Sequence, residues 1–160
     1  MTQYRYAYQG YDAKKMARAV GIGINISFKQ AMEICKHIKH RSLESARTIL
    51  NSVLEMKQAI PYKAHNKDVP HRAGMMAGRY PQNASKEILK LLDSVEANAN
   101  SKGLSNLYIT HIIANIAPAI RRGGRNAGEG KRAHVEIVVE EKKVEKKKYT
   151  PIKDRKGKTK

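Results

Sequence analysis

Two strand-like segments flank a stretch rich in glycine and arginine, and this arrangement restricts the possible folds of the chain more than any other feature. Residues 107–117 (LYITHIIANIA) are largely β-branched, and residues 134–140 (HVEIVVE) alternate between the two faces of a strand. Both patterns predict β-strands, and together they predict an antiparallel hairpin over about 107–141. The stretch RRGGRNAGEGKRA (121–133) offers almost nothing to bury. Because a two-stranded ribbon alone in water is marginally stable, the outer half of this hairpin needs a surface to lie on.

Three amphipathic segments before the hairpin predict helices. Ser27 opens a capping-box sequence, SFKQ, before the first helix, and Ser42 precedes a second helix that Pro61 should end. A third helix is expected over about 84–101, with Gly103 placed for a left-handed cap.

The amino-terminal part predicts the remaining strand structure. Tyr4, Tyr6 and Tyr8 alternate with smaller or polar residues, which is the pattern of a short strand, and residues 10–26 are expected to be mostly extended or loop. The predicted fold class is therefore α+β, with three helices packed on a small antiparallel sheet and a long protruding β-hairpin.

Charge points to the class of partner. Lys and Arg number 32 against 14 Asp and Glu, a formal net charge of +18, and a polyanion normally offsets such self-repulsion. Nucleic acid is the first candidate and an anionic membrane surface the second. No apolar run is long enough to span a bilayer, the amino terminus lacks the apolar centre of a signal peptide, and the single cysteine, Cys35, suits a reducing cytosol.

Residues 1–141 are predicted to form one nucleic-acid-binding domain. The segment 142–160 continues the positive charge with hardly any apolar content, so we expect a basic tail that is disordered when the protein is free.

The glycine and arginine stretch is the first candidate RNA-binding segment. Glycine lets a backbone approach a phosphate closely, and arginine binds phosphate with two parallel hydrogen bonds. The alternative is a solvated turn with scattered charges. The cations of this stretch are Arg121, Arg122, Arg125, Lys131 and Arg132.

A second candidate is the segment 61–82, which is too long for an ordinary connector. Its cations are interleaved with Tyr62 and Tyr80, as binding to phosphates and unstacked bases requires, so we expect a loop that becomes ordered against a partner. The alternative is a loop packed on its own domain. The cations we expect to contact RNA are Lys63, His71, Arg72 and Arg79.

No pattern for metal binding or catalysis is evident. His37 and His40 lie three residues apart, but there is no second cysteine and no HExxH or CxxC sequence. Cys35 lies on an apolar helix face and is expected in the core. We predict no metal, no cofactor and no enzymatic activity.

Several segments together resemble the large-subunit ribosomal protein family called twenty-two in bacteria and archaea and seventeen in eukaryotes. Their order and spacing together are specific to the family, and HRAG (71–74) and AGRYPQ (77–82) resemble the archaeal and eukaryotic branch; we assign the archaeal type. The segments are YAY (6–8), NISFKQAMEIC (25–35), VLEMKQAIPYKAHNKDVPHRAG (53–74), AGRYPQNASKEIL (77–89), EANANSKGL (96–104), NLYITHI (106–112) and HVEIVVEE (134–141).

The resemblance implies a cytoplasmic structural protein of the large subunit. It implies binding to ribosomal RNA (rRNA), early subunit assembly, contact with neighbouring ribosomal proteins, and a hairpin over about 114–133 that lines the nascent-peptide exit tunnel. Lys29, His71, Arg72, Arg79 and Tyr80 would face RNA. The hairpin tip would be Gly124, Arg125, Asn126, Ala127, Gly128, Glu129 and Gly130.

The tip departs from the family pattern, because it reads GRNAGEGKRA where members usually carry a tip close to PRAxGRA on a ribbon several residues longer. Two other functions stay open from the residues alone. One is a free-standing nucleic-acid-binding regulator of the helix-turn-helix kind, and the other is a small enzyme that acts on RNA.

Overall fold

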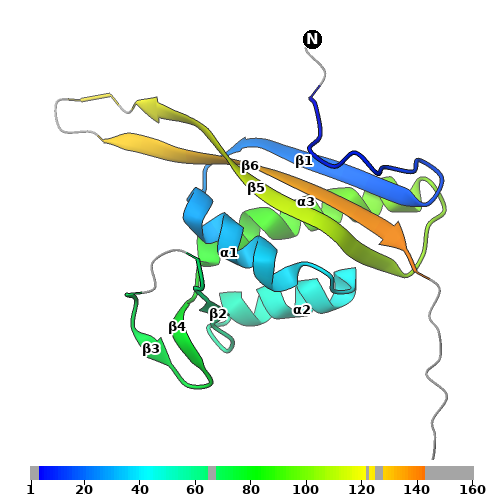
Figure 1. Cartoon of the computed structure of the whole chain (residues 1–160). Helices are drawn as coiled ribbons and strands as arrows, with labels where there is room; N and C mark the ends of the chain where they lie inside the picture. The colour runs from blue at the N-terminus through cyan, green and yellow to red at the C-terminus, as the bar shows by residue number, and fades with distance from the viewer. Residues whose placement is uncertain (1–3, 65–67, 122, 125–127, 143–160) are drawn as a thin grey trace, which may run out of the picture.

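The structure, a computed structural model, describes residues 4–64, 68–121, 123–124 and 128–142. Figure 1 shows a sheet covered on one face by helices, and a smaller sheet beside them. In chain order the elements are β1 (Met16–Ile24), α1 (Phe28–Ile38), α2 (Leu43–Leu54), β2 (Ile60–Pro61), β3 (His71–Arg72), β4 (Met75–Arg79), α3 (Gln82–Asn100), β5 (Leu107–Arg121) and β6 (Glu129–Glu141). The predicted α+β class is confirmed.

The predicted hairpin is formed by β5 and β6, which pair antiparallel from Leu107 with Glu141 to Arg121 with Glu129. Strand β6 is central, in the order β1-β6-β5. Pairing with β1 stops at Ala133 of β6, so the outer part of the hairpin has only two strands. Pro118 lies inside a register shift of β5, where its missing N–H interrupts no regular ladder.

The core lies between this sheet and the helices. Helix α3 packs on β1 and β6, α1 packs on β5 and β6, and α2 packs on α3. The side chains of β6 that point inward are Val135, Ile137 and Val139, as their alternation predicted. Gly21 lets β1 approach α3, because a Cβ there would lie 2.7 Å from a methyl group of Leu91. Cys35 is buried in this core, as predicted.

The helices agree with the prediction except at their ends. Ser42 accepts a hydrogen bond from the Ser45 N–H, but Ser27 caps α1 without a side-chain hydrogen bond, so the predicted capping box is absent. Helix α2 ends at Leu54 rather than near Pro61, because Ile60 and Pro61 pair as a strand with β4. Gly103 has the predicted left-handed conformation, with φ of 72°.

The segment 61–82 differs from the expected irregular loop. Strands β2, β4 and β3 form a small antiparallel sheet in that order. Tyr62 packs with Val69 and Ala77 and is only 3% exposed, so its ring is not available to an unstacked base. The alternative of a segment packed on its own domain therefore holds for this part.

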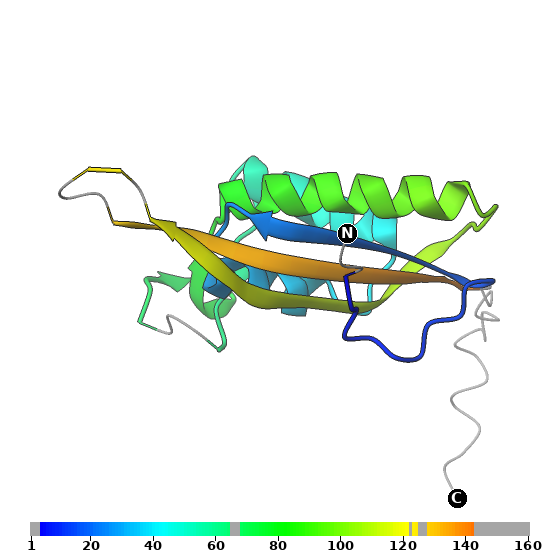
Figure 2. The same cartoon turned by 90° about the horizontal axis from the view of Figure 1, so that it is seen from above.

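The amino terminus was also predicted incorrectly. Residues 4–8 form no strand, and the strand of this region is β1, within the stretch expected to be extended or loop. Residues 4–11, which we call the N-terminal strap, lie beside the sheet on the side away from α3 (Figure 2). Glu136 of β6 lies beneath the strap and is 1% exposed.

The carboxylate of Glu136 fixes the strap. It accepts hydrogen bonds from the Tyr4 hydroxyl (2.6 Å) and from the Ala7 N–H (2.9 Å). Burial, together with this hydrogen bond, raises the pKa of Tyr4 to about 12. Farther along the strap, the Arg18 guanidinium lies 4.3 Å from the ring centres of Tyr6 and Tyr11.

The predicted basic tail beyond Lys142 lies outside the described residues, as do Arg122 and the tip residues 125–127. Among the described helices, none is long and apolar enough to cross a membrane.

Candidate nucleic-acid interface

Four of the predicted RNA-binding residues surround one hollow where the hairpin leaves the body. We call it the hairpin-base hollow; its volume is about 440 Å³. Its cations come from three segments that are far apart in the sequence. They are Lys29, Arg79, Lys131 and Arg132.

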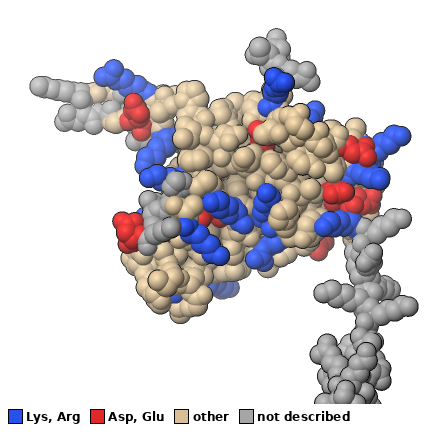
Figure 3. All heavy atoms as spheres, in the orientation of Figure 1, with Lys and Arg blue, Asp and Glu red and all other residues tan. Residues whose placement is uncertain are grey.

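The fold explains how these cations come together. Lys29 lies in the first turn of α1 and Arg79 ends β4. Lys131 and Arg132 lie on β6 beyond the end of β1, where only β5 flanks them. Figure 3 shows Lys and Arg side chains along the hairpin and on the body below it. A hollow lined by two lysines and two arginines can hold the phosphates of a nucleic acid chain.

The predicted residues of the 61–82 segment lie apart from this hollow, except for Arg79. His71 and Arg72 form β3 and are exposed. The Arg72 guanidinium lies 5.3 Å from the ring centre of Tyr80, which is half-buried and packs against the main core. Lys63 lines a different hollow, at the other end of α1.

The remaining predicted residues lie farther out on the hairpin. Arg121 is exposed and pairs in register with Glu129. At the tip, Gly124 adopts a positive φ of 109°, which glycine tolerates without strain. Of the other tip residues, Gly128 and Glu129 are exposed, and Gly130 is opposite Ile120. Arg122, Arg125, Asn126 and Ala127 are outside the described residues.

Exposed apolar side chains on the hairpin were not predicted. Ile116 is 72% exposed and Ile120 is 48% exposed, both on the part of β5 near or beyond the end of β1. The β-branched pattern of this segment predicted a strand, but the sequence alone did not indicate which face of the strand would be exposed to solvent.

Comparison with known protein families identifies the family of this chain. Residues 19–140 match the model of the family described as Ribosomal protein L22p/L17e. The chain belongs to this family. The match begins inside β1 and ends one residue before the end of β6, so it includes nearly all of the hairpin and the residues of the hollow at its base.

Curated relatives of this L22p/L17e family member are archaeal proteins named "Large ribosomal subunit protein uL22". The Archaeoglobus fulgidus protein is 48% identical over 127 residues, which span 76% of this chain and 82% of the relative. The Methanococcus vannielii protein is 42% identical over 141 residues, which span 81% of this chain and 92% of the relative. The predicted resemblance and its archaeal type are confirmed.

Membership in a ribosomal protein family supports a structural role rather than an enzymatic one. Burial raises the pKa of the Cys35 thiol to about 12, so it is a poor nucleophile. Among the residues that the structure describes, no group of three or more His, Cys, Asp or Glu side chains could hold a metal ion.

Two half-buried histidines make stability depend on pH. Burial lowers the pKa of His37, helped by Arg41 and Lys63, and burial lowers the pKa of His111, helped by Lys39 and opposed by Glu136. Because the unfolded chain then binds more protons, the free energy of unfolding should rise with pH up to the ordinary histidine pKa of about 6.5 and level off above it.

Urea unfolding across pH 5 to 8 measures this dependence. We expect the free energy of unfolding to rise less with pH in the double variant His37→Gln/His111→Gln than in the unchanged chain. His71→Gln, which removes an exposed imidazole, is the matched control. An undiminished rise in the double variant would assign the pH dependence to other groups.

Proposed function

We propose that this protein is a structural component of the large ribosomal subunit in the cytoplasm, where it binds rRNA. Its cations would replace counterions between packed RNA helices, and no step of catalysis is assigned to it. Shape and phosphate contacts would dominate over contacts with base edges.

The observation that carries the rRNA-binding proposal is the outer part of the hairpin. There, β5 and β6 extend as two strands past the end of β1, with Ile116 and Ile120 exposed and with Arg121 and Lys131 at the surface. Such a ribbon has no core of its own, so a partner must cover it. RNA fits this surface because it supplies negative phosphates to the cations and flat base or sugar surfaces to the apolar side chains.

The same feature supports the finer proposal that the hairpin lines the nascent-peptide exit tunnel. The hairpin projects from one end of the body in both views (Figures 1 and 2). A projecting arm can reach between RNA segments while the body stays at the particle surface, next to neighbouring ribosomal proteins. Its tip would then meet the emerging peptide, and its anchoring would assist subunit assembly.

Co-sedimentation tests the proposal as a whole. The tagged protein, expressed in an archaeal relative, should sediment with large subunits through a moderate-salt cushion. Recovery only among free proteins would contradict the proposal. The free-standing regulator would be indicated by binding to one duplex sequence that resists competition by rRNA.

The tip arginines provide a sharper prediction. Replacing Arg121, Arg122 and Arg125 together with alanine should leave the body folded, because the described residues of the main core are apolar and Arg121 is exposed. We expect a reduced share of the variant in large subunits, because its outer hairpin loses phosphate contacts. Quantitative mass spectrometry of purified subunits measures this share, and circular dichroism checks the fold. Lys14→Gln/Lys15→Gln/Lys86→Gln, with the same loss of charge at exposed positions on the body, is the control. Equal incorporation of both variants would exclude the arginines as anchors.

A further inference from the structure

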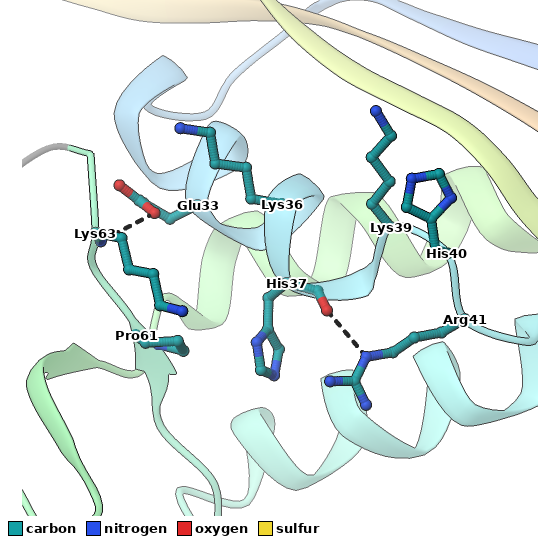
Figure 4. A pocket seen from close by; sticks show the side chains of 8 residues that line it. All are labelled: Glu33, Lys36, His37, Lys39, His40, Arg41, Pro61 and Lys63. Carbon is teal, nitrogen blue, oxygen red and sulfur yellow. Dashed lines mark hydrogen bonds between the residues drawn. The ribbon is translucent and has the colours of Figure 1, made fainter.

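A second cationic hollow lies at the end of α1 opposite to the hairpin-base hollow. Its volume is about 490 Å³, and it is formed by the last turn of α1, the turn that follows, and the start of the 61–82 segment (Figure 4). We call its basic side chains the α1 cation cluster. They are Lys36, His37, Lys39, His40, Arg41 and Lys63.

The positive charge of the α1 cation cluster is hardly offset within the protein. Among the described residues, its lysines and Arg41 form no ion pair with a carboxylate, whereas Arg47 on α2 pairs with both Asp93 and Glu96. The single acid in the wall, Glu33, accepts hydrogen bonds from the N–H groups of Lys63 (3.2 Å) and Ala64 (2.7 Å). Four lysine and arginine charges thus surround a hollow that contains one carboxylate.

The backbone places His40 in this cluster at a conformational cost. Its φ is 60°, the left-handed region that a residue with a Cβ seldom adopts. Hydrogen bonds to β5 fix the turn there. The His40 N–H donates to the Ile109 carbonyl (3.0 Å), and the Ile109 N–H donates to the Arg41 carbonyl (2.9 Å). Glycine would fit this position without strain, so the imidazole can be removed here without disturbing the backbone.

One polar atom in the hollow lacks a partner. The Nε2 atom of His37 is buried and has no hydrogen bond among the described residues. In Figure 4 its ring lies between Lys63 and Arg41, whose Nε donates to the His37 carbonyl (3.0 Å). A buried polar atom without a partner is costly, and an anionic oxygen in the hollow would give this nitrogen an acceptor.

We propose that the α1 cation cluster binds phosphodiester groups of rRNA, at a site separate from the hairpin-base hollow. The inference rests on the proposed function, because it takes rRNA as the partner. The first turn of α1 borders one hollow and its last turn borders the other. An 11-residue helix is roughly 16 Å long, so the two hollows can hold two different stretches of RNA backbone at once.

Binding of rRNA to two charge-matched variants of the full chain tests this site. The cluster variant is Lys36→Gln/Lys39→Gln/Lys63→Gln, and the control is Lys14→Gln/Lys15→Gln/Lys86→Gln, at exposed positions elsewhere. Loss of three phosphate contacts should reduce the slope of log K against log salt by about 2 to 3. If the cluster variant and the unchanged chain bind equally at 1 M salt, this smaller slope makes the variant bind about a hundredfold or more weakly than the unchanged chain at 0.1 M. We expect less than a tenfold loss for the control.

Footprinting shows where the RNA is held. Phosphorothioate-substituted rRNA should contain one group of protected phosphates that becomes cleavable with the cluster variant. A second group should become cleavable with Lys29→Gln/Arg79→Gln. Identical footprints for the cluster variant and the unchanged chain would overturn the proposal.

The variant His40→Gly distinguishes a loss of RNA contacts from misfolding as the cause of weaker rRNA binding. It removes the imidazole but suits the left-handed backbone, so its thermal midpoint should stay close to that of the unchanged chain while rRNA affinity falls. Unchanged affinity would count against the site.

The outcomes also separate this site from the proposed function. If the unchanged chain fails to bind rRNA, the proposed function fails. If the unchanged chain binds and the cluster and control variants lose affinity equally, only the α1 site fails. If the cluster variant loses binding to poly-glutamate while its rRNA affinity matches the control, the cluster serves an acidic protein and the proposal is wrong.

Discussion

Raising the salt concentration from about 50 to about 200 mM is expected to weaken binding of this protein to rRNA by about a thousandfold or more. The reason is that phosphates neutralised by the protein release their condensed counterions, and added salt reverses this release. Nine of the predicted RNA-binding residues are Lys or Arg, and four cations meet at the hairpin-base hollow. Six or more phosphate contacts would produce a loss of about this size.

Binding isotherms at several salt concentrations measure the effect, and circular dichroism at each concentration controls for unfolding. The variant Lys29→Gln/Arg79→Gln/Lys131→Gln/Arg132→Gln should bind more weakly and with a smaller salt dependence. An affinity that changes less than tenfold over this range, together with strong discrimination among single base changes, would indicate base readout. Base readout is what a free-standing regulator requires, so this result would contradict the structural role.

The hairpin and the helices could be predicted because their signals are local. The alternation of 134–140 and the apolar stripes of the three helices depend only on the period of each element, and the side chains expected in the main core are found there. The burial of the opposite face of β6, with Glu136, was not predicted. Strand β1 has no such local signal. Gly21 and Gly23 weaken its strand pattern, and it is a strand because β6 supplies its hydrogen bonds.

The errors in the strap and in the 61–82 segment have the same origin. The alternating tyrosines at 4–8 suggested a strand, but their rings cover the outer face of the sheet and their backbone joins no ladder. In the 61–82 segment, the pairing of β2 and β3 with β4 depends on contacts between residues well separated in the sequence. Such contacts cannot be read from the composition of a loop.

The residues of the candidate site were predicted from the sequence, but their meeting at one hollow in the fold was not. Lys29, Arg79 and Lys131 are each visible as cations, yet only the packing of α1 and β4 beside the hairpin base brings them to one hollow. The α1 cation cluster was missed for a related reason. Lys63 lies far from the cations at the end of α1 in the sequence and joins them only in the folded chain.

Replacing Glu136 with alanine is expected to lower the free energy of unfolding by about 3 kcal/mol, since two hydrogen bonds to a buried charged group are lost. The carboxylate sits at the centre of the sheet, where β6 is flanked by both β1 and β5. Without it, the strap loses the bonds that hold Tyr4 and Ala7 to the sheet. For a chain of this size the change corresponds to a fall in Tm of roughly 6–12 °C, which calorimetry measures.

Glu140→Ala is the matched control on the same strand, because Glu140 is less buried and accepts one side-chain hydrogen bond, from the Thr110 hydroxyl (3.2 Å). Its cost should stay below about 1 kcal/mol. Tyr4→Phe removes one of the two bonds of Glu136, and in the Glu136→Ala background it should cost almost nothing. Trypsin supplies a local readout, because cleavage after Arg5 should become faster in Glu136→Ala under conditions where the body stays folded. Equal Tm values for the two glutamate variants, with no change in cleavage at Arg5, would mean that Glu136 does not hold the strap.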